Sequence, residues 1–159
     1  MDVFEYNRCV DRFSDRIYGY ILKQIRDSDT AKDIVQEAYA KLWVKVDTVA
    51  FVSAKSYLYK TAYHTMIDWI RKRKFETSME HIPHPKTNHS YSDLSEHLEA
   101  GLNRLPEIQR AVVLLRDYEG YSYHEIGEIL DLNESQVKVY IYRARLALKK
   151  YIGKIEVVI

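Results

Sequence analysis

The sequence is poor in residues that interrupt helices or cross-link a chain. Its 159 residues include five Gly, three Pro and one Cys, Cys9. One thiol cannot form an intramolecular disulfide, which favours a reducing, cytoplasmic setting. Alternation of apolar and polar residues is also scarce. Together these shortages predict an all-α fold.

Other features are lacking as well. No apolar segment approaches the roughly 20 residues that a membrane-spanning helix requires, so no membrane insertion is expected. The mixed, acidic N-terminus MDVFEYNRCV does not resemble a secretory signal. The chain contains no glycine-rich phosphate loop and no Ser, His and Asp arrangement typical of hydrolases. We therefore expect neither an enzyme activity nor a cofactor.

What the sequence does contain is charge that is unevenly distributed. The net charge is only +1, yet basic residues outnumber acidic ones over 48–80, which includes RKRK at 71–74, and over 134–159. Two basic segments on a nearly neutral chain are typical of a protein that contacts a polyanion at two places. Ordinary solvated helix ends are the alternative, and charge alone does not separate the two.

Apolar residues at helical spacing predict three helices in the first half of the chain. The turn RDSDTAKD offers Asp29 or Thr30 as a cap for the second helix, with Asp33 in its first turn. The segment DTVAFVS lacks helical periodicity and is predicted to be a loop. The predicted helices cover residues 1–26, about 30–46 and about 54–74.

The segment TSMEHIPHPKTNHSYSD is rich in Ser, Thr, Asn, His and Pro and has no periodicity, which indicates a flexible linker. Beyond it, Pro106 is expected at the first position of a helix that ends near a left-handed Gly120. We predict two small helical domains, with the first over residues 1–76, the linker over 77–92 and the second over 93–159.

The stretch SYHEIGEILDLNESQVKVYIYRARLALKKY contains two helix-start signals eleven residues apart. Ser122 with Glu125 forms a capping box, and Asn133 with Gln136 offers a similar pair. Two helices joined by so short a turn predict a helix-turn-helix. Its second helix has a basic outer face and fits the major groove of DNA, although an amphipathic helix in an unrelated bundle is the alternative.

Two motifs in series resemble the sigma-70 superfamily. The run LNRLPEIQRAVVLLRDYEGYSYHEIGEILDLNESQVKVYIYRARLALKKY resembles region 4, and DIVQEAYAKLW followed by SYLYKTAYHTMIDWIRKRK resembles region 2. The linker between them leaves no room for region 3. This pattern is that of an extracytoplasmic-function sigma factor, which recruits core RNA polymerase and recognises the −10 and −35 promoter elements.

The resemblance implies a polymerase-docking face on the second helix. Asp33, Gln36 and Glu37 lie at i, i+3 and i+4, on one side of that helix, with Lys41 nearby. In the family this face docks on a basic coiled coil of the largest polymerase subunit, and the flap region of the polymerase binds the second domain. A solvated face, with Asp33 serving the helix N-terminus, is the alternative.

The resemblance also assigns the −10 element to the loop at 47–56 and the helix after it. In the family this loop binds a base flipped from the non-template strand, which requires aromatic and hydrogen-bonding groups. His64 replaces the usual Asn and Tyr57 the usual Trp, which leaves base preference open, and nearby Tyr59 and Tyr63 are equally suited to a core. The expected −10 DNA-binding residues are Phe51, Ser53, Lys55, Tyr57, Lys60, His64, Arg71, Lys72, Arg73 and Lys74, the last four through phosphates.

The resemblance assigns the −35 element to the helix-turn-helix. Arg143 is the best candidate for a bidentate contact with guanine. Gln136 and Arg145 are expected to contact the DNA backbone, and Ser122 and Tyr123 to add phosphate contacts. The expected −35 DNA-binding residues are Ser122, Tyr123, Gln136, Lys138, Val139, Tyr142, Arg143 and Arg145.

The implied partners are core RNA polymerase, promoter DNA and an anti-sigma factor of the kind that commonly inactivates this family. A stand-alone DNA-binding regulator is one alternative, but it leaves DIVQEAYAKLW unexplained. A zinc enzyme is another, on account of His81, His84, His89 and His97. The first three lie in the polar linker, where regular helical or turn spacing is lacking, and His97 only lies close by, so no metal is expected.

Overall fold

The computed structural model of the chain describes residues 1–77 and 93–158. It divides into two compact units, one of Met1–Glu80 with Gly127–Leu132 and the other of His81–Ile126 with Asn133–Ile159. Every regular element over the described residues is helical, which confirms the predicted all-α class. Of the segment predicted as a linker, 77–92, Thr77 belongs to α3, and the rest, with His81, His84 and His89, lies outside the described residues.

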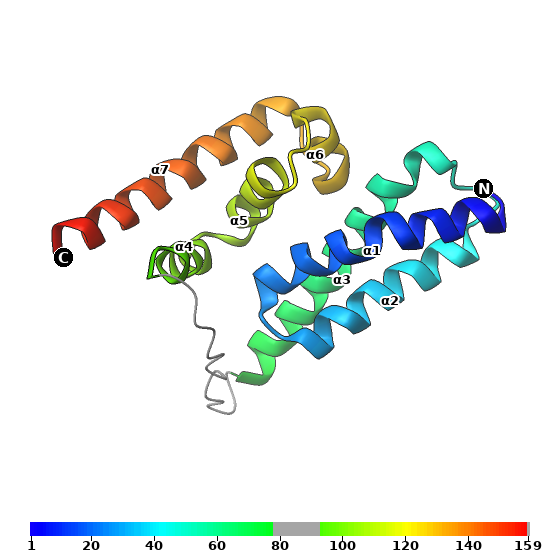
Figure 1. The fold of residues 1–159 in the computed structure, drawn as a ribbon, viewed down its shortest axis with the longest axis horizontal. Helices are drawn as coiled ribbons and strands as arrows, with labels where there is room; N and C mark the ends of the chain where they lie inside the picture. Colours follow the sequence, from blue (N-terminus) through cyan, green and yellow to red (C-terminus); the bar gives the residue numbers. More distant parts are fainter. Residues whose placement is uncertain (78–92, 159) are drawn as a thin grey trace. The chain divides into compact units, whose positions relative to one another are not determined.

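Three long helices make up most of the first unit: α1 (Val3–Ile25), α2 (Ser28–Val44) and α3 (Ala54–Thr77). They lie side by side, and each contacts the other two (Figure 1). A single 3₁₀ turn, η1 (Phe51–Ser53), precedes α3. The helix α3 extends three residues beyond the predicted end at Lys74.

The start of α2 differs from the prediction. Arg26 adopts a left-handed conformation with φ of 57°, so α1 ends and α2 begins within a few residues. The N-cap is therefore Asp27, whose side chain accepts a hydrogen bond from the Thr30 amide at 3.2 Å, and neither Asp29 nor Thr30 is the cap. As a result Asp33 lies beyond the first turn and does not serve the helix N-terminus.

The core of the first unit is apolar and aromatic. Tyr20 and Tyr59 are almost fully buried and meet edge to face with ring centroids 5.6 Å apart. Because Tyr59 and Tyr63 are both buried, they belong to the core and not to an exposed face. Complete burial of each large side chain stabilises the unit by about 1.5–3 kcal/mol. The largest fully buried side chains here are Ile17, Tyr20, Ile21, Leu42, Leu58, Tyr59 and Met66.

The second unit contains α4 (Asp93–Arg104), α5 (Glu107–Val113), a π-helical turn η2 (Leu114–Tyr118) and α7 (Glu134–Val158). Both α4 and α5 pack against α7. At Gly101 a Cβ atom would lie 3.0 Å from the side chains of Leu148 and Tyr151, so glycine permits the close approach of α4 to α7.

The sequence predicted one helix start and one helix end in the second unit, and only the end is confirmed. Pro106 precedes α5 as its N-cap, and the first helical residue is Glu107, so its predicted place at the first helical position was wrong by one. Proline still fits there, because it needs no hydrogen bond for a missing amide. Gly120 has φ of 75°, which confirms the left-handed end that follows η2.

The helix-turn-helix has the local structure that its sequence predicts. It begins with α6 (Tyr123–Leu130). In the first capping box the Glu125 amide donates to Ser122 Oγ at 3.1 Å, and in the second the Gln136 amide donates to Asn133 Oδ1 at 2.8 Å. The reciprocal bonds are present at 3.4 Å and 3.0 Å. Both predicted helix starts are therefore confirmed.

Candidate nucleic-acid and polymerase interfaces

One polar stripe runs along the exposed side of α2. Asp33, Gln36, Glu37 and Lys41 are all exposed, while the opposite side of the helix is buried. Glu37 and Lys41 form an ion pair at 3.2 Å, one turn apart. Such an exposed pair contributes about 0.3–0.5 kcal/mol, so a stronger partner could readily displace it. The stripe thus presents acidic and amide groups that the fold does not require.

The C-terminal end of α2 adds an apolar surface that the sequence did not lead us to expect. Val44 is 83% exposed and Trp43 is 48% exposed, and the Trp43 ring meets the Tyr6 ring at 5.0 Å. Two adjacent exposed apolar side chains beside a polar stripe could extend a contact surface. Helical periodicity would have placed Trp43 next to the stripe, but only the packing of α1 shows that it is left exposed.

The loop before α3 carries the first of the predicted −10 residues. Phe51 is half-buried, Ser53 is exposed, and Lys55 and Tyr57 are half-buried. The Arg8 guanidinium lies over the Phe51 ring, with its central carbon 5.7 Å from the ring centroid. Arg8 was not among the predicted residues, because it lies far from this loop in the sequence.

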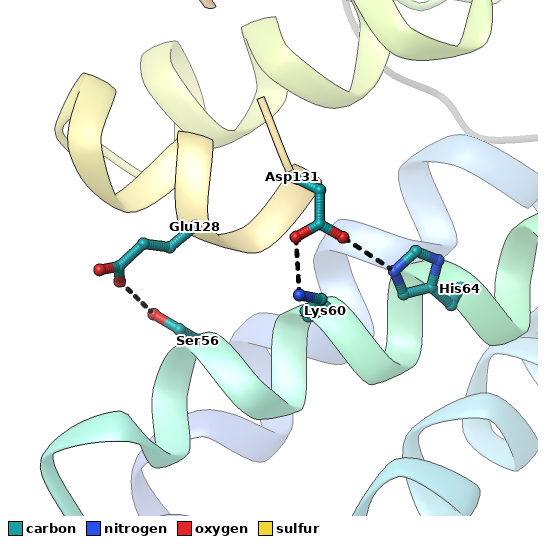
Figure 2. A network of polar contacts seen from close by, with 5 residues as sticks. All are labelled: Ser56, Lys60, His64, Glu128 and Asp131. Atoms are coloured by element: carbon teal, nitrogen blue, oxygen red, sulfur yellow. Dashed lines mark hydrogen bonds and ion pairs between the residues drawn. The ribbon is translucent and has the colours of Figure 1, made fainter. Parts of the chain in front are cut away.

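Three polar side chains form a stripe on α3 at intervals of four residues: Ser56, Lys60 and His64. In the first unit they face two carboxylates from residues 127–132 (Figure 2). Lys60 Nζ donates to Asp131 at 2.7 Å, and Ser56 Oγ donates to Glu128 at 3.4 Å. His64 Nε2 lies 3.8 Å from the other Asp131 oxygen.

These contacts show which groups a DNA strand would have to replace. Lys60 and Asp131 are both partly exposed, and such an ion pair typically contributes about 0.2–1 kcal/mol. A phosphate that takes the place of the Asp131 carboxylate gives Lys60 an equivalent partner. The polar network therefore leaves the predicted role of Lys60 and His64 chemically possible at a small cost.

The C-terminal end of α3 is basic, as predicted. Arg71, Lys72 and Lys74 are exposed, and the Arg73 guanidinium lies 5.0 Å from the centroid of the Trp69 ring. Basic side chains at a helix C-terminus interact favourably with the helix dipole. Three cations thus face solvent while Arg73 also packs on an aromatic ring.

The second helix of the helix-turn-helix, α7, has two distinct sides. Val137, Ile141 and Ala144 are buried, whereas the predicted reading residues are exposed. Tyr142 is 67% exposed and Val139 43%, which is far more than a core role would allow. The exposed side includes Lys138, Val139, Tyr142 and Arg143.

A cation–aromatic cluster lies at the start of α6. The Tyr123 ring lies 4.5 Å from the Arg116 guanidinium and 5.6 Å from Lys138 Nζ, measured to the ring centroid. Arg116 Nη1 also donates to the Tyr121 carbonyl at 2.8 Å. Exposed Ser122 lies next to this cluster. Basic and aromatic groups together fit a phosphate backbone, and Arg116 was missed because it precedes the helix-turn-helix.

Two predicted DNA contacts also have structural partners. Gln136 accepts the Asn133 amide in the second capping box. Arg145 donates to both carboxylate oxygens of Asp117, at 3.1 Å and 2.5 Å. That hydrogen bonding raises the pKa of Arg145 above its ordinary value. Both side chains therefore make contacts within the protein itself.

The described residues contain no group of three or more His, Cys, Asp or Glu side chains arranged to hold a metal ion. No helix within these same ranges is long and apolar enough to cross a bilayer. Cys9 is buried as a free thiol, and burial raises its pKa.

Comparison with family models gives two matches in series. The model for sigma-70 region 2 matches residues 9–76, and the model for sigma-70 region 4 matches residues 91–148. The first match covers the α2 stripe and α3 except its last residue, and the second covers α6 and α7 as far as Leu148. Both matches agree with the motifs seen in the sequence.

Several curated proteins are similar over most of their length. The RNA polymerase sigma factor YlaC of Bacillus subtilis is 30% identical, with 90% of this chain and 89% of that protein covered. The ECF RNA polymerase sigma factor SigW of the same organism is 30% identical, with coverage of 89% and 85%. Among solved structures, the sigma factor RpoE of Bartonella quintana, crystallised with the anti-sigma factor NepR, has a TM-score of 0.78 at 23% identity, with 95% of this chain and 98% of that chain covered.

Proposed function

The chain belongs to the extracytoplasmic-function group of sigma-70 family RNA polymerase sigma factors, and on that premise we propose which of its surfaces perform each step of promoter recognition. It is a sigma factor that binds core polymerase and directs promoter-specific initiation. We assign region 2 to residues 1–76 and region 4 to residues 93–159, with 77–92 as the connection. The proposal is carried by one observation: the residues expected to contact DNA or polymerase are exposed or half-buried on two different units, beside buried cores.

The stripe on α2 is our proposed polymerase-docking surface. Because Asp27 caps the helix, Asp33 is left without a capping role, and its carboxylate lies on the same side as Gln36 and Glu37. An acidic and amide surface suits a basic coiled coil of the largest subunit, and complementary charge speeds and orients such docking. Exposed Trp43 and Val44 at the end of the helix would add apolar contact area. The flap region of polymerase would bind the second domain.

For the −10 element, the loop around Phe51 would bind an unpaired base by stacking and hydrogen bonding. The other contacts with the −10 element would come from Ser53, Lys55, Tyr57, Lys60 and His64. The exposed basic end of α3 would neutralise phosphates, which adds affinity without sequence information.

For the −35 element, the exposed side of α7 would enter the major groove. Arg143 is the candidate for a bidentate contact with guanine, and Tyr142 offers apolar contact with a base edge. Arg116 and Lys138, which both lie close to the Tyr123 ring, would contact phosphates near Ser122. We place Gln136 and Arg145 at the DNA backbone, each with its structural partner retained.

We also propose that the protein works in the cytoplasm and that an anti-sigma factor controls it. The family commonly uses such a partner, and the exposed polar and apolar surfaces of both units would be its natural targets. A direct check is to express the tagged protein in its source bacterium and identify the proteins that co-purify with it by mass spectrometry. Recovery of polymerase alone under all growth conditions would contradict the anti-sigma proposal.

In vitro transcription tests the proposed polymerase surface. Purified core polymerase of the source bacterium is mixed with this protein and genomic DNA fragments, and transcript start sites are sequenced. We expect defined start sites only when the protein is present, and a loss of polymerase binding by the double variant Gln36→Ala with Glu37→Ala. Lys32→Ala is the matched control, because Lys32 is exposed on the same helix outside the stripe. Normal transcription by the double variant would show that the α2 stripe is not the surface that docks on polymerase.

A further inference from the structure

The N-terminal turns of α1 lie against the loop that is proposed to bind the −10 base. The terminal amino group of Met1 donates to the Val46 carbonyl at 2.9 Å, across 45 positions of sequence. A capping box orders the first turn, in which the Glu5 amide donates to Asp2 Oδ1 at 2.7 Å. The start of α1 is therefore fixed in direction and attached to the segment just before the loop.

Arg8 extends from this part of α1 onto the aromatic ring of the loop. Its guanidinium carbon lies 5.7 Å from the Phe51 ring centroid, within the range of a cation–π contact. Arg8 is exposed and Phe51 is half-buried, so the contact lies at the surface. An exposed contact of this kind is weak and does not determine whether the chain folds. It can, however, bias the orientation of the ring.

The guanidinium retains its capacity to bind an anion. Within residues 1–77 and 93–158, no carboxylate forms an ion pair with Arg8. A planar guanidinium presents five N–H donors and pairs with phosphate through two parallel hydrogen bonds, while its face can remain on an aromatic ring. Arg8 can therefore stay on the Phe51 ring and, at the same time, donate hydrogen bonds to a phosphate of the strand whose base stacks on Phe51.

We propose that Arg8 belongs to the −10 interface. It orients the Phe51 ring for stacking on the unpaired base, and it donates hydrogen bonds to the phosphate beside that base. The inference rests on the proposed function, because it requires that the loop around Phe51 binds a single-stranded −10 element. It adds a residue from α1 to an interface otherwise formed by the loop and α3.

Selection from a DNA pool tests the proposal. Holoenzyme reconstituted from the full chain and core polymerase is incubated with single-stranded oligonucleotides that carry eight consecutive random positions, and bound strands are sequenced. The variants are Arg8→Ala, Arg8→Lys and Phe51→Leu, with Arg12→Ala as the control, because Arg12 is exposed one turn further along α1. Base preference is the frequency of each base at each position among the bound strands. A variant that is partly unfolded binds fewer strands, but its folded fraction still reports the preference.

We expect the wild type to enrich one base at a position where Phe51→Leu shows no preference. Arg8→Ala should weaken the preference at that same position by roughly two- to fivefold and reduce total binding. Arg8→Lys should restore total binding, since it keeps the charge, but not the preference, since it lacks a planar group. Arg12→Ala should match the wild type in both respects.

The outcomes separate this inference from the proposed function. If Phe51→Leu loses the preference and Arg8→Ala retains it, Arg8 has no part in the interface, while the function of the loop stands. If Phe51→Leu itself retains the preference, both the stacking role of Phe51 and the inference for Arg8 are wrong. If the wild-type holoenzyme enriches no sequence at all, the proposed −10 recognition fails.

Discussion

At the scale of single residues, neighbours decide what a side chain can do. Arg143 and Arg145 are two positions apart on α7, and both are exposed. Arg145 is bound to Asp117 through two hydrogen bonds, which direct it toward η2. Arg143 lies on the outer side with Val139 and Tyr142. We therefore expect Arg143 to contact a base, and Arg145 to stabilise the packing of α7 against η2.

Replacing Arg143 by Ala should relax selectivity at one base pair of the −35 element. Loss of a bidentate arginine–guanine contact removes about 1–3 kcal/mol of discrimination against the wrong base. The measurement is transcription by holoenzyme from templates with single substitutions across the element. Lys149→Ala, a change at an exposed residue later on the same helix, should leave the pattern unchanged. An equal loss at every position would instead indicate a backbone contact.

Tyr39 makes the stability of the first unit sensitive to alkaline pH. It is buried, and its hydroxyl donates to the Cys9 carbonyl at 2.9 Å. Burial raises the pKa of Tyr39 to about 12, from 10.0. Because the folded state keeps this proton more tightly than the unfolded state, its contribution is fully present below pH 10 and is lost as the pH rises toward 12.

The variant Tyr39→Phe tests this linkage. Loss of the hydroxyl should reduce the free energy of unfolding at pH 7 by about 0.5–1.5 kcal/mol. The decline in stability between pH 10 and 12 should then be shallower than in the wild type, since one raised pKa is removed. Urea unfolding followed by circular dichroism at several pH values measures both effects. Parallel declines for the two proteins would show that Tyr39 does not titrate in this range.

At the scale of elements, α3 combines three roles along one helix. Leu58, Ala62 and Met66 are buried in the core, and the stripe of Ser56, Lys60 and His64 faces carboxylates of the first unit. Its last turns carry the exposed cations. Burial of the apolar side positions the other two features, so the helix can present recognition groups on a rigid support.

The basic end of α3 should contribute affinity without selectivity. The double variant Arg71→Ala with Lys72→Ala should weaken DNA binding by the same factor for all sequences. Each lost phosphate contact should reduce the slope of log affinity against log salt by about 0.7–0.9. Fluorescence anisotropy with labelled DNA between about 50 and 200 mM salt gives the slope.

The control for this experiment removes the same charge elsewhere. The double variant Lys32→Ala with Lys45→Ala changes two exposed lysines at other places in the first unit. Its slope should stay close to that of the wild type, because neither lysine belongs to the proposed DNA surface. Identical slopes for both double variants and the wild type would exclude α3 from phosphate binding.

At the scale of the whole molecule, the two proposed reading surfaces belong to different units. Residues proposed for the −10 element lie in the first unit, and α7 lies in the second. Binding of both units to one polymerase would make the second DNA contact effectively intramolecular and increase its strength without any new contact. Neither unit then needs to bind its element tightly by itself.

This division predicts a strict dependence on promoter spacing. Once a promoter is found by transcription of genomic fragments, base pairs can be inserted between its two elements without changing either element. We expect holoenzyme to lose most of its transcription after an insertion of a few base pairs, because polymerase fixes the distance between the units. Undiminished transcription over a range of spacings would show that only one element is recognised.

Much of the fold could be predicted because its signals are local. The all-α class, both capping boxes and the left-handed Gly120 are confirmed, and each depends on residues within a few positions of one another. The start of α2 was wrong, because the left-handed Arg26 has no strong signal in sequence and moved the cap to Asp27. The end of α2 was also wrong, because Val46 is apolar at helical spacing yet lies beyond the helix.

The family, and with it the function, was determined by the sequence itself, because two motifs in the right order specify a sigma factor. The roles of individual site residues stay predictions. Only the tertiary structure decided that Tyr59 is buried while Tyr142 is exposed, that Arg145 binds Asp117, and that Arg8 lies over Phe51. These outcomes depend on which side of a helix meets another helix, and periodicity does not tell a core aromatic from an aromatic at an interface.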